Sequence, residues 1–315
     1  MKIFVAGATG ALGRQLLPRL AERGHEVTGM TRRASKQQLV RDLGGRPVVA
    51  DALDRESVTR AVKEAEPEVI VMQLTAIPHA IDLRHFDQDF AQTNRLRTEG
   101  TDHLLAAGRE AGTRRVVAQG YAPNSYARSG SPVKAEDDPL DDSPPDKMRP
   151  TVDALRHLER AVTGATWAEG VVLRYGTFYG PGTNVSLGPE GAMVEAIRKR
   201  QLPLVGKAGG VWSFIHIEDA AEATVNAIEG HGRGVFNVVD DEPAPVADWL
   251  PVAAKAVGAP APRRVPRWLG RLFAGETATV MMTEARGASN AKAKSELAWT
   301  PRHSSWREGF ASGLE

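Results

Sequence analysis

The sequence of 315 residues contains no cysteine, which excludes disulfides, thiolate metal sites and cysteine nucleophiles together. It also lacks any run of about 20 apolar residues, the length that a membrane-spanning helix needs. Neither sign of charge is in excess, because 40 Lys and Arg residues stand against 39 Asp and Glu residues. Proteins that bind nucleic acid hold its phosphates on a basic face, so this balance argues against such a partner. These absences favour a globular, cytoplasmic protein without a membrane anchor or a leader peptide.

Short apolar runs alternate with helical patterns through the first half of the chain. Strands are expected at 2–6, 25–30, 47–50, 69–74, 115–119 and 170–174, and helices at 12–23 and 90–111. Alternation of this kind is typical of a parallel sheet with helices on both faces. The strands are almost continuously apolar, as a sheet covered on both sides requires. The sequence therefore predicts an α/β fold with a doubly wound parallel sheet of the Rossmann type.

The composition changes after this alternating part. Residues 131–150 are rich in proline and acidic side chains, which predicts a long exposed loop. Beyond Gly180, glycine and proline become frequent and the helical patterns shorten, which indicates a smaller C-terminal cap. The predicted division is a dinucleotide-binding domain of residues 1–176, to which 214–240 return, and a substrate-binding cap of 177–213 and 241–315.

Three glycines lie where the first expected strand meets the first expected helix. Gly7, Gly10 and Gly13 allow a tight turn there, and a pyrophosphate can then approach the helix N-terminus. Unpaired N–H groups and the helix dipole favour an anion at that point. The turn therefore predicts a dinucleotide site, with a tight turn that binds nothing as the alternative.

The G-x-x-G-x-x-G spacing resembles that of the extended short-chain dehydrogenase/reductase family, also called the NAD-dependent epimerase/dehydratase family. The resemblance extends to Asp51 after the third strand, to the helix around Asn94, and to the segments 175–181 (YGTFYGP), 214–220 (FIHIEDA) and 290–301 (NAKAKSELAWTP). It implies a homodimer, as in many members, and a cofactor held by Gly7, Thr9, Gly10, Ala11, Leu12, Gly13, Thr31, Arg32, Arg33, Asp51, Ala52, Leu74, Thr75, Asn94, Gln119, Tyr175, Gly176 and Phe178.

The end of the second strand predicts NADP in preference to NAD. A carboxylate at this place would bond the ribose hydroxyls of NAD and repel the 2′-phosphate of NADP. This chain instead has Thr31 followed by Arg32 and Arg33. Two guanidinium groups suit a phosphate in charge and in geometry, whereas two solvated arginines on a loop are the alternative.

The catalytic pattern that the resemblance implies is broken in this sequence. The family has a Ser or Thr after the fifth strand and a Tyr-x-x-x-Lys pair, and no such pair exists in this chain. Tyr121 stands at the Ser position, while Thr151 and Leu155 stand at the Tyr and Lys positions. We therefore predict Tyr121 as the proton donor, because the resemblance places it beside the nicotinamide, with Thr151 able to orient or relay.

Several functions remain open at this point. One is hydride transfer between NADPH and a carbonyl or activated alkene of a small apolar or aromatic metabolite. Another is a sensor that binds NADP without turnover. A nucleotide-sugar epimerase or dehydratase is less well matched, because Trp212 replaces the arginine that holds a diphosphate in those members. Tyr126, Trp212, Met282 and Arg286 are the candidate substrate residues. Packed core is an equal alternative for Trp212, and methionine pairs more often serve packing.

No metal site is predicted, because the histidines lack ligand spacing. His216 is expected to support the junction between the cap and the sheet. Asp219 is expected to cap the helix that begins near Ala220.

Overall fold

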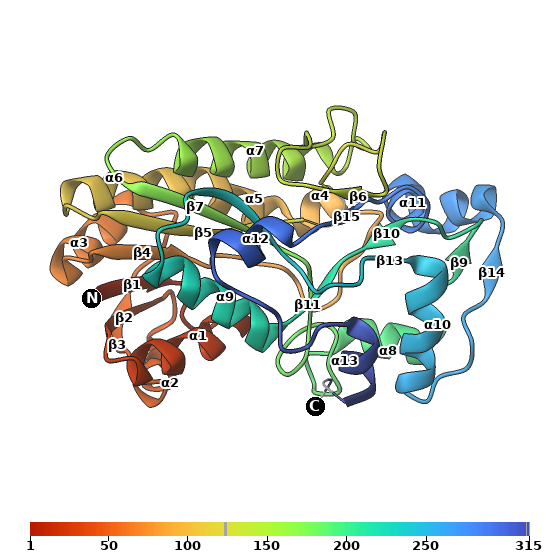
Figure 1. Cartoon of the computed structure of the whole chain (residues 1–315), viewed down its shortest axis with the longest axis horizontal. Helices are drawn as coiled ribbons and strands as arrows, with labels where there is room; N and C mark the ends of the chain where they lie inside the picture. The colour runs from red at the N-terminus through yellow and green to blue at the C-terminus, as the bar shows by residue number, and fades with distance from the viewer. Residues whose placement is uncertain (123–124, 313, 315) are drawn as a thin grey trace.

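A seven-stranded sheet forms the centre of the larger part of the molecule (Figure 1). The computed structural model describes residues 1–122, 125–312 and 314. The strand order is β12-β7-β5-β4-β1-β2-β3, and every neighbouring pair is parallel. The strands are β1 (Lys2–Ala6), β2 (Glu26–Thr31), β3 (Arg46–Val49), β4 (Val69–Met72), β5 (Arg115–Tyr121), β7 (Glu169–Tyr175) and β12 (Gly234–Val238). The predicted doubly wound sheet is confirmed. The strand order reverses between β1 and β4, because β2 and β3 lie on one side of β1 and the later strands on the other, and such folds bind their ligands at this point.

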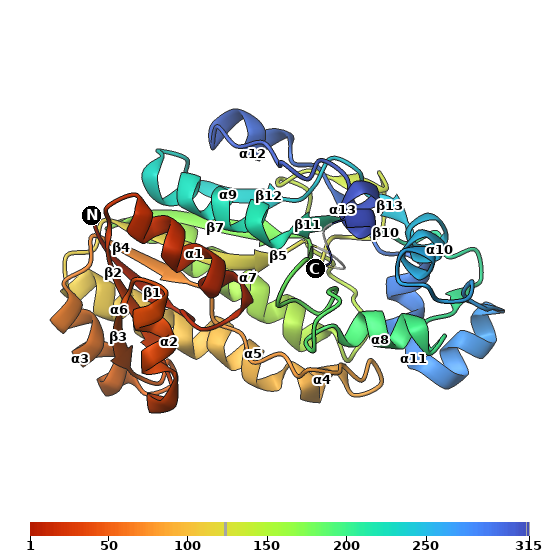
Figure 2. The same ribbon diagram turned by 90° about the horizontal axis from the view of Figure 1, so that it is seen from below.

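Helices cover both faces of this sheet (Figure 2). One face packs against α1 (Ala11–Glu22), α9 (Ile217–Glu229) and α12 (Ala291–Glu296), whose apolar side chains join one core. The other face packs against α3 (Arg55–Ala65), α6 (Thr101–Glu110) and α7 (Arg149–Thr163). The 3₁₀ turn Ala34–Lys36 and α2 (Gln37–Asp42) lie between β2 and β3. None of the helices in the described ranges is long and apolar enough to cross a membrane.

The helix predicted at 90–111 is present but is not uniformly α-helical. It is divided into α5 (Ala91–Arg95), a π-helical turn (Leu96–Gly100) and α6, and a short α4 (Phe86–Asp89) precedes them. The helical spacing of apolar residues therefore predicted a helix correctly but did not reveal the π-helical turn inside it. A π turn inserts an extra residue and rotates the side chains on either side of it, and such turns are frequent at functional sites.

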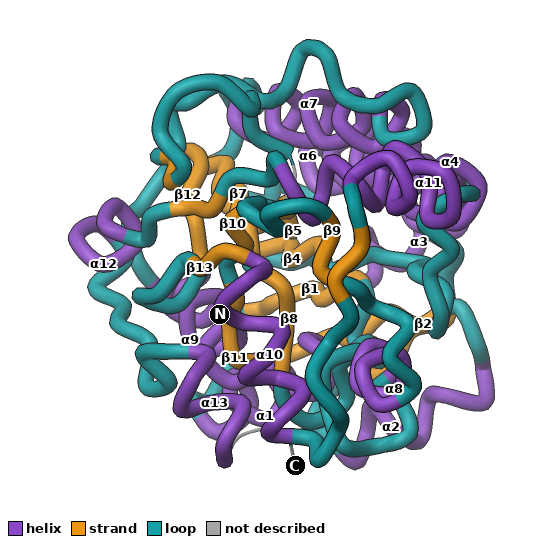
Figure 3. Tube along the Cα trace, turned by 90° about the vertical axis from the view of Figure 1, so that its right-hand side faces the viewer, coloured by secondary structure: helices purple, strands orange, loops and turns teal. Residues whose placement is uncertain are grey.

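The cap is built from short elements around an aromatic core. Trp212, Phe214, Trp249, Trp306 and Phe310 contact one another there. Seen from the cap end, α10 (Val246–Ala256) and α13 (Trp306–Ser312) lie together (Figure 3). The helix α11 (Arg267–Thr283) lies near α4, where Arg84 Nη2 donates to the Leu272 carbonyl at 3.4 Å. The elements of the cap are β8 (Thr177–Tyr179), α8 (Ala192–Arg198), β9 (Leu204–Val205), β10 (Val211–Trp212), β11 (Phe214–His216), β13 (Ala244–Pro245), α10 (Val246–Ala256), β14 (Arg264–Val265), α11 (Arg267–Thr283) and α13 (Trp306–Ser312).

The border between the two parts differs in places from the predicted division. Ala293, Leu297 and Trp299 belong to the core of the sheet, although the prediction assigned 241–315 to the cap. The loop 131–150 contains β6 (Val133–Lys134), which pairs with β15 (Gly287–Ala288) and so joins two distant segments. The division into a cofactor domain and a substrate domain stays a prediction.

Candidate cofactor and substrate site

The turn between β1 and α1 can be built only with glycine at two of its positions. Gly7 has a φ of +96°, and a Cβ atom there would lie 2.3 Å from the carbonyl oxygen of Gln73. A Cβ atom on Gly13 would lie 2.4 Å from the carbonyl oxygen of Gly7. Since real Cβ atoms do not approach backbone this closely, α1 can start directly against the end of β1 only because both residues lack side chains.

The first turn of α1 has the features of an anion site. Its N-cap is Gly10, which offers no side-chain acceptor, and the first turn contains no acidic residue. The helix has 12 residues, and its dipole places partial positive charge at this end. The side chain of Leu12 is buried in the core, so this residue faces a ligand through its backbone. The turn of Gly7, Gly10 and Gly13 with the first turn of α1, called the cradle below, thus fits the pyrophosphate of a dinucleotide in shape and in charge.

Exposed arginines follow the second strand. The N–H group of Arg33 donates to Thr31 Oγ1 at 3.3 Å, which fixes the bend after β2. Arg32 and Arg33 are both exposed, and within the described ranges neither pairs with a carboxylate. Asp51 lies in the next turn along the sheet edge, where its Oδ1 accepts the N–H group of Leu53 at 3.0 Å. The predicted contacts of these residues with the adenosine half of the cofactor stay predictions.

The positions of the missing catalytic pair are buried on α7. Thr151 is 5% exposed, and its Oγ1 accepts a hydrogen bond from Asn94 Nδ2 at 3.1 Å. Leu155 is packed in an apolar cluster with Tyr126 and Val152. Tyr121, half-buried, ends β5 opposite Tyr175 of β7 and packs against this cluster. The cation that the family places one helical turn after its tyrosine is therefore absent at position 155.

Sequence reasoning missed a cation at this corner, Arg97 in the π turn. Its side chain is 5% exposed, and its Nη1 donates to Asn94 Oδ1 at 3.5 Å. Burial lowers the pKa of Arg97 to about 10, an effect that nearby Tyr121 partly opposes. The structure thus brings Asn94, Arg97, Tyr121 and Thr151 together at the carboxyl end of β5.

The other predicted cofactor residues lie in loops after the strands or in the core. Leu74 and Thr75 follow β4, and Gln119 lies in β5. Tyr175 is buried in the sheet core, where its hydroxyl lies 2.7 Å from Thr224 Oγ1 and accepts a 3.4 Å bond from Gln73 Nε2. Burial raises the pKa of Tyr175, so its side chain serves the core as a neutral phenol. Gly176 and Phe178 continue from it toward the cap, and Ala52 is buried beside α6.

Most of the predicted substrate residues are engaged in packing. The hydroxyl of Tyr126 donates to Asn237 Oδ1 at 2.6 Å and accepts from Arg174 Nη1 at 2.8 Å, and burial raises its pKa to about 12. The indole N–H of Trp212 donates to the Met281 carbonyl at 2.9 Å within the cap core, which also contains Met282. These placements favour the packed-core alternative for Trp212 and Met282. Arg286, half-buried, donates to the Arg128 carbonyl.

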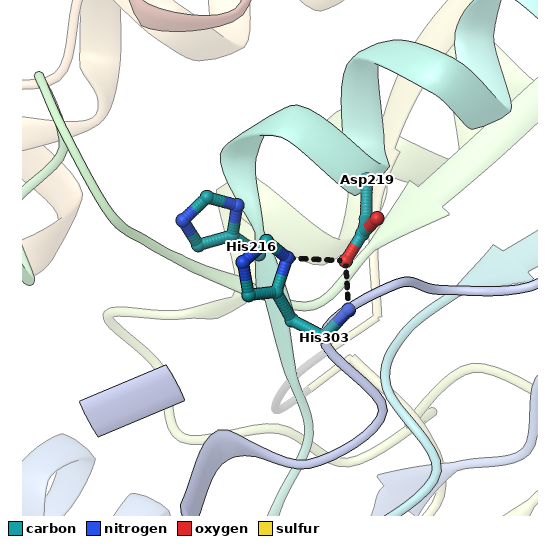
Figure 4. A group of neighbouring side chains, drawn as sticks. All are labelled: His216, Asp219 and His303. Atoms are coloured by element: carbon teal, nitrogen blue, oxygen red, sulfur yellow. Dashed lines mark hydrogen bonds and ion pairs between the residues drawn. The ribbon is translucent and has the colours of Figure 1, made fainter. Parts of the chain in front are cut away.

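A cluster of two histidines and one carboxylate joins α9 to the C-terminal segment (Figure 4). The rings of His216 and His303 are stacked with centroids 3.8 Å apart. Asp219 accepts the backbone N–H groups of Arg302 and His303, both at 2.9 Å, and His303 Nδ1 at 3.0 Å. The prediction that Asp219 caps α9 is wrong, because His216 is the N-cap and accepts the Glu218 N–H group. With the Asp219 carboxylate occupied in this way, the cluster holds two segments together at the junction predicted for His216.

Comparison with known proteins gives a family match and similar enzymes. Residues 3–238 match the model of the NAD dependent epimerase/dehydratase family. A protein of a Streptomyces species called 3-diazoavenalumate denitrifying reductase is 47% identical over 311 residues, which cover 98% of this chain and 99% of that protein. A 4-hydroxy-2-methyl-3-oxo-4-farnesyl-3,4-dihydroquinoline-1-oxide ketoreductase of Stigmatella aurantiaca is 26% identical over 264 residues, covering 82% of this chain and 74% of that protein.

Solved structures share the fold over the whole chain. UDP-glucose 4-epimerase of Thermotoga maritima with UDP-glucose superposes with a TM-score of 0.77 at 19% identity, covering 100% of this chain and 97% of the other. The Thermus thermophilus UDP-glucose 4-epimerase in complex with NAD gives a TM-score of 0.74 at 24% identity, covering 100% and 98%. At these identities the likeness establishes the architecture alone.

Proposed function

The chain belongs to the NAD-dependent epimerase/dehydratase family, and from this premise we propose that it is an NADPH-dependent reductase that replaces the diazo group of an aromatic compound by hydrogen. The observation that carries the proposal is the content of the family's catalytic positions. Thr151 and Leu155 cannot act as the acid and the cation of a tyrosine–lysine pair. A denitrifying reductase is also the activity named for the Streptomyces relative that is 47% identical over nearly the whole chain.

Denitrifying reduction needs no proton from the protein. An aryl diazonium ion that accepts a hydride gains a C–H bond and loses its C–N bond, and dinitrogen leaves with the electron pair of that bond. The charges of the hydride and the diazonium ion cancel, so no acid has to protonate a product oxygen. A ketone or enone, in contrast, becomes an alkoxide or enolate that must be protonated. A site in which Thr151 and Leu155 replace the tyrosine–lysine pair therefore suits a diazo compound better than a carbonyl.

The bound nicotinamide cofactor supplies the hydride, and this chain supplies position. Gly7, Gly10 and Gly13 form the cradle at the start of α1 for the pyrophosphate. Arg32 and Arg33 hold the 2′-phosphate, since both are exposed and unpaired with carboxylates among the described residues. Thr151 and Asn94, which share a hydrogen bond, fix the start of α7 against α5 beside the substrate.

Replacing Arg32 and Arg33 by alanine together should weaken NADPH binding by about 30-fold, since a hydrogen bond to a charged group contributes roughly 1.5–3 kcal/mol. NADH binding should change little, because NADH lacks the 2′-phosphate. Calorimetric titration with both cofactors measures the difference. Arg60→Ala is the matched control, because Arg60 is an exposed arginine on α3. An equal loss for NADPH and NADH would assign the two arginines a role other than phosphate recognition.

Isotope transfer tests the reaction itself. The purified protein is mixed with 4-carboxybenzenediazonium and NADPH deuterated at either face of the nicotinamide C4, and dinitrogen release is followed with the deuterium content of the ring. We expect deuterium from one face only, and none on the ring when the label is in the solvent. Spontaneous reduction is measured without protein and subtracted. No acceleration above that background, or equal transfer from both faces, would refute the proposal.

Carbonyl reduction with Tyr121 as the acid is the second candidate, and the position of Arg97 favours it. A guanidinium close to a tyrosine hydroxyl stabilises the phenolate and so makes the tyrosine a better acid. Tyr121→Phe separates the two functions. Denitrification should persist within a few-fold in this variant, because it needs no acid, whereas reduction of an aromatic ketone should fall by roughly 100-fold or more. Cofactor affinity serves as the control in both assays.

A further inference from the structure

We propose that Arg97 is the anion-binding residue of the substrate site, and that its guanidinium holds a carboxylate or phenolate oxygen of an aromatic substrate. This inference rests on the proposed function for the identity of the substrate. It is supported independently by the burial, the partners and the position of the arginine.

The first support is the missing counterion. Among the residues that the structure describes, three arginines are buried: Arg97, Arg115 and Arg174. Arg115 bonds Glu169 at 2.5 Å, and Arg174 bonds Glu159 at 2.6 Å. Within the same described ranges, Arg97 has no carboxylate within 4.0 Å, and its side-chain hydrogen bond to the Asn94 amide oxygen is long, at 3.5 Å. Arg97 is thus the buried arginine whose charge no carboxylate of the described residues compensates.

An uncompensated buried charge is expensive, and a protein rarely keeps one without a use for it. Burial of an ionised group without a partner costs several kcal/mol, which an anionic ligand can offset. The lowered pKa of Arg97, to about 10, has this desolvation as its main cause. The guanidinium still carries its charge at neutral pH and offers several donors to a planar oxyanion.

The position of Arg97 is the second support. It lies in the π turn Leu96–Gly100, the interruption that separates α5 from α6. Its neighbours are Asn94, which bonds Thr151, and Tyr121 at the end of β5. By the resemblance to the family, Tyr121 and Thr151 stand at two of the family's catalytic positions. The corner therefore retains a cation although Leu155 has replaced the lysine, and the cation comes from a different helix.

Binding of unreactive aromatic anions tests the proposal without any turnover. The protein loaded with NADP⁺ is titrated calorimetrically with cinnamate and with cinnamamide, which differ only in the carboxylate, and with 4-nitrophenolate and nitrobenzene at pH 8. We expect at least one anion to bind the wild type ten times or more tightly than its neutral partner. The pair that shows this preference identifies whether Arg97 holds a carboxylate oxygen or a phenolate oxygen of the substrate.

Arg97→Gln should bring the affinity of the preferred anion down to that of the neutral partner, and Arg97→Lys should restore part of it. NADPH affinity should stay within threefold of the wild type. Arg95→Gln is the matched control, because Arg95 lies two residues earlier, is exposed and pairs with Glu99 at 2.8 Å. The melting temperature of Arg97→Gln should equal or exceed that of the wild type, since an unpaired buried charge is removed.

Three results would overturn the inference: equal binding of anions and neutral partners by the wild type, an Arg97→Gln variant with lower stability and unchanged anion preference, or a loss confined to NADPH. The diazonium assay distinguishes the two proposals. Anion binding that depends on Arg97 together with no denitrification would remove the proposed reaction and leave the site. If the protein denitrifies the diazonium ion and Arg97→Gln leaves the KM for that substrate unchanged, the proposed reaction stands and the anion site at Arg97 is removed.

Discussion

Gly13→Ala is expected to abolish tight binding of both NADPH and NADH and to lower the stability of the fold. The new Cβ atom would lie 2.4 Å from the Gly7 carbonyl oxygen and 2.6 Å from the Ala8 carbonyl oxygen. Both neighbours are backbone atoms at the junction of β1 with α1, so the clash cannot be relieved by turning a side chain. The start of α1 has to move away from the sheet, and overpacking of this kind costs roughly 1–3 kcal/mol.

The displacement also moves the donors that a pyrophosphate would use. Loss of two charge-assisted hydrogen bonds costs about 3 kcal/mol or more, so we expect the affinity for either cofactor to fall by roughly 100-fold or more. Calorimetric titration and thermal unfolding measure the two effects. Gly10→Ala is the control for folding, since a Cβ atom there lies 3.4 Å from the Gly7 oxygen, an ordinary contact. If Gly13→Ala binds NADPH as the wild type does, the turn between β1 and α1 is not the pyrophosphate site.

The sheet could be predicted closely because its signals are local. Each strand of the predicted sheet is a short apolar run bounded by polar or turn residues, and 2–6 matches β1 (Lys2–Ala6) to the residue. The helix predicted at 12–23 agrees with α1 (Ala11–Glu22) to within one residue at each end. These elements are buried on one or both faces over their whole length, so hydrophobic periodicity determines both their type and their extent.

The corner around Arg97 could not be predicted from the sequence because its signal is not local. An arginine between Leu96 and Thr98 reads as one more charge on an exposed face of a helix. Arg97 lies in the π turn and is buried, and only the three-dimensional structure reveals that no carboxylate of the described ranges faces it there. For Tyr126 the difficulty is similar, since its partners Asn237 and Arg174 are 111 and 48 residues away in the chain.

The buried ion pair between α7 and β7 provides the second large effect. Glu159→Ala leaves the guanidinium of Arg174 without its carboxylate, and breaking a buried pair in this way costs about 3–5 kcal/mol. Arg174 is 5% exposed at its side chain and Glu159 is 12% exposed, so the pair is largely shielded from water. Urea unfolding followed by tryptophan fluorescence should show the transition at a clearly lower concentration. Glu64→Ala, which breaks the exposed pair with Arg46, should cost about 0–1 kcal/mol.

The double variant Glu159→Leu with Arg174→Met should recover most of the loss, because two apolar side chains of similar volume remove both charges at once. If the double variant is instead as unstable as Glu159→Ala, the bonds of Arg174 to the Tyr126 hydroxyl and the Glu136 carbonyl carry the stability. The comparison bears on the site as well, since α7 carries Thr151 and β7 leads into Tyr175 and Gly176. Arg174 and Arg97 are thus two buried guanidinium groups with opposite expected effects on stability: removing the carboxylate of Arg174 destabilises the fold, whereas removing the charge of Arg97 does not.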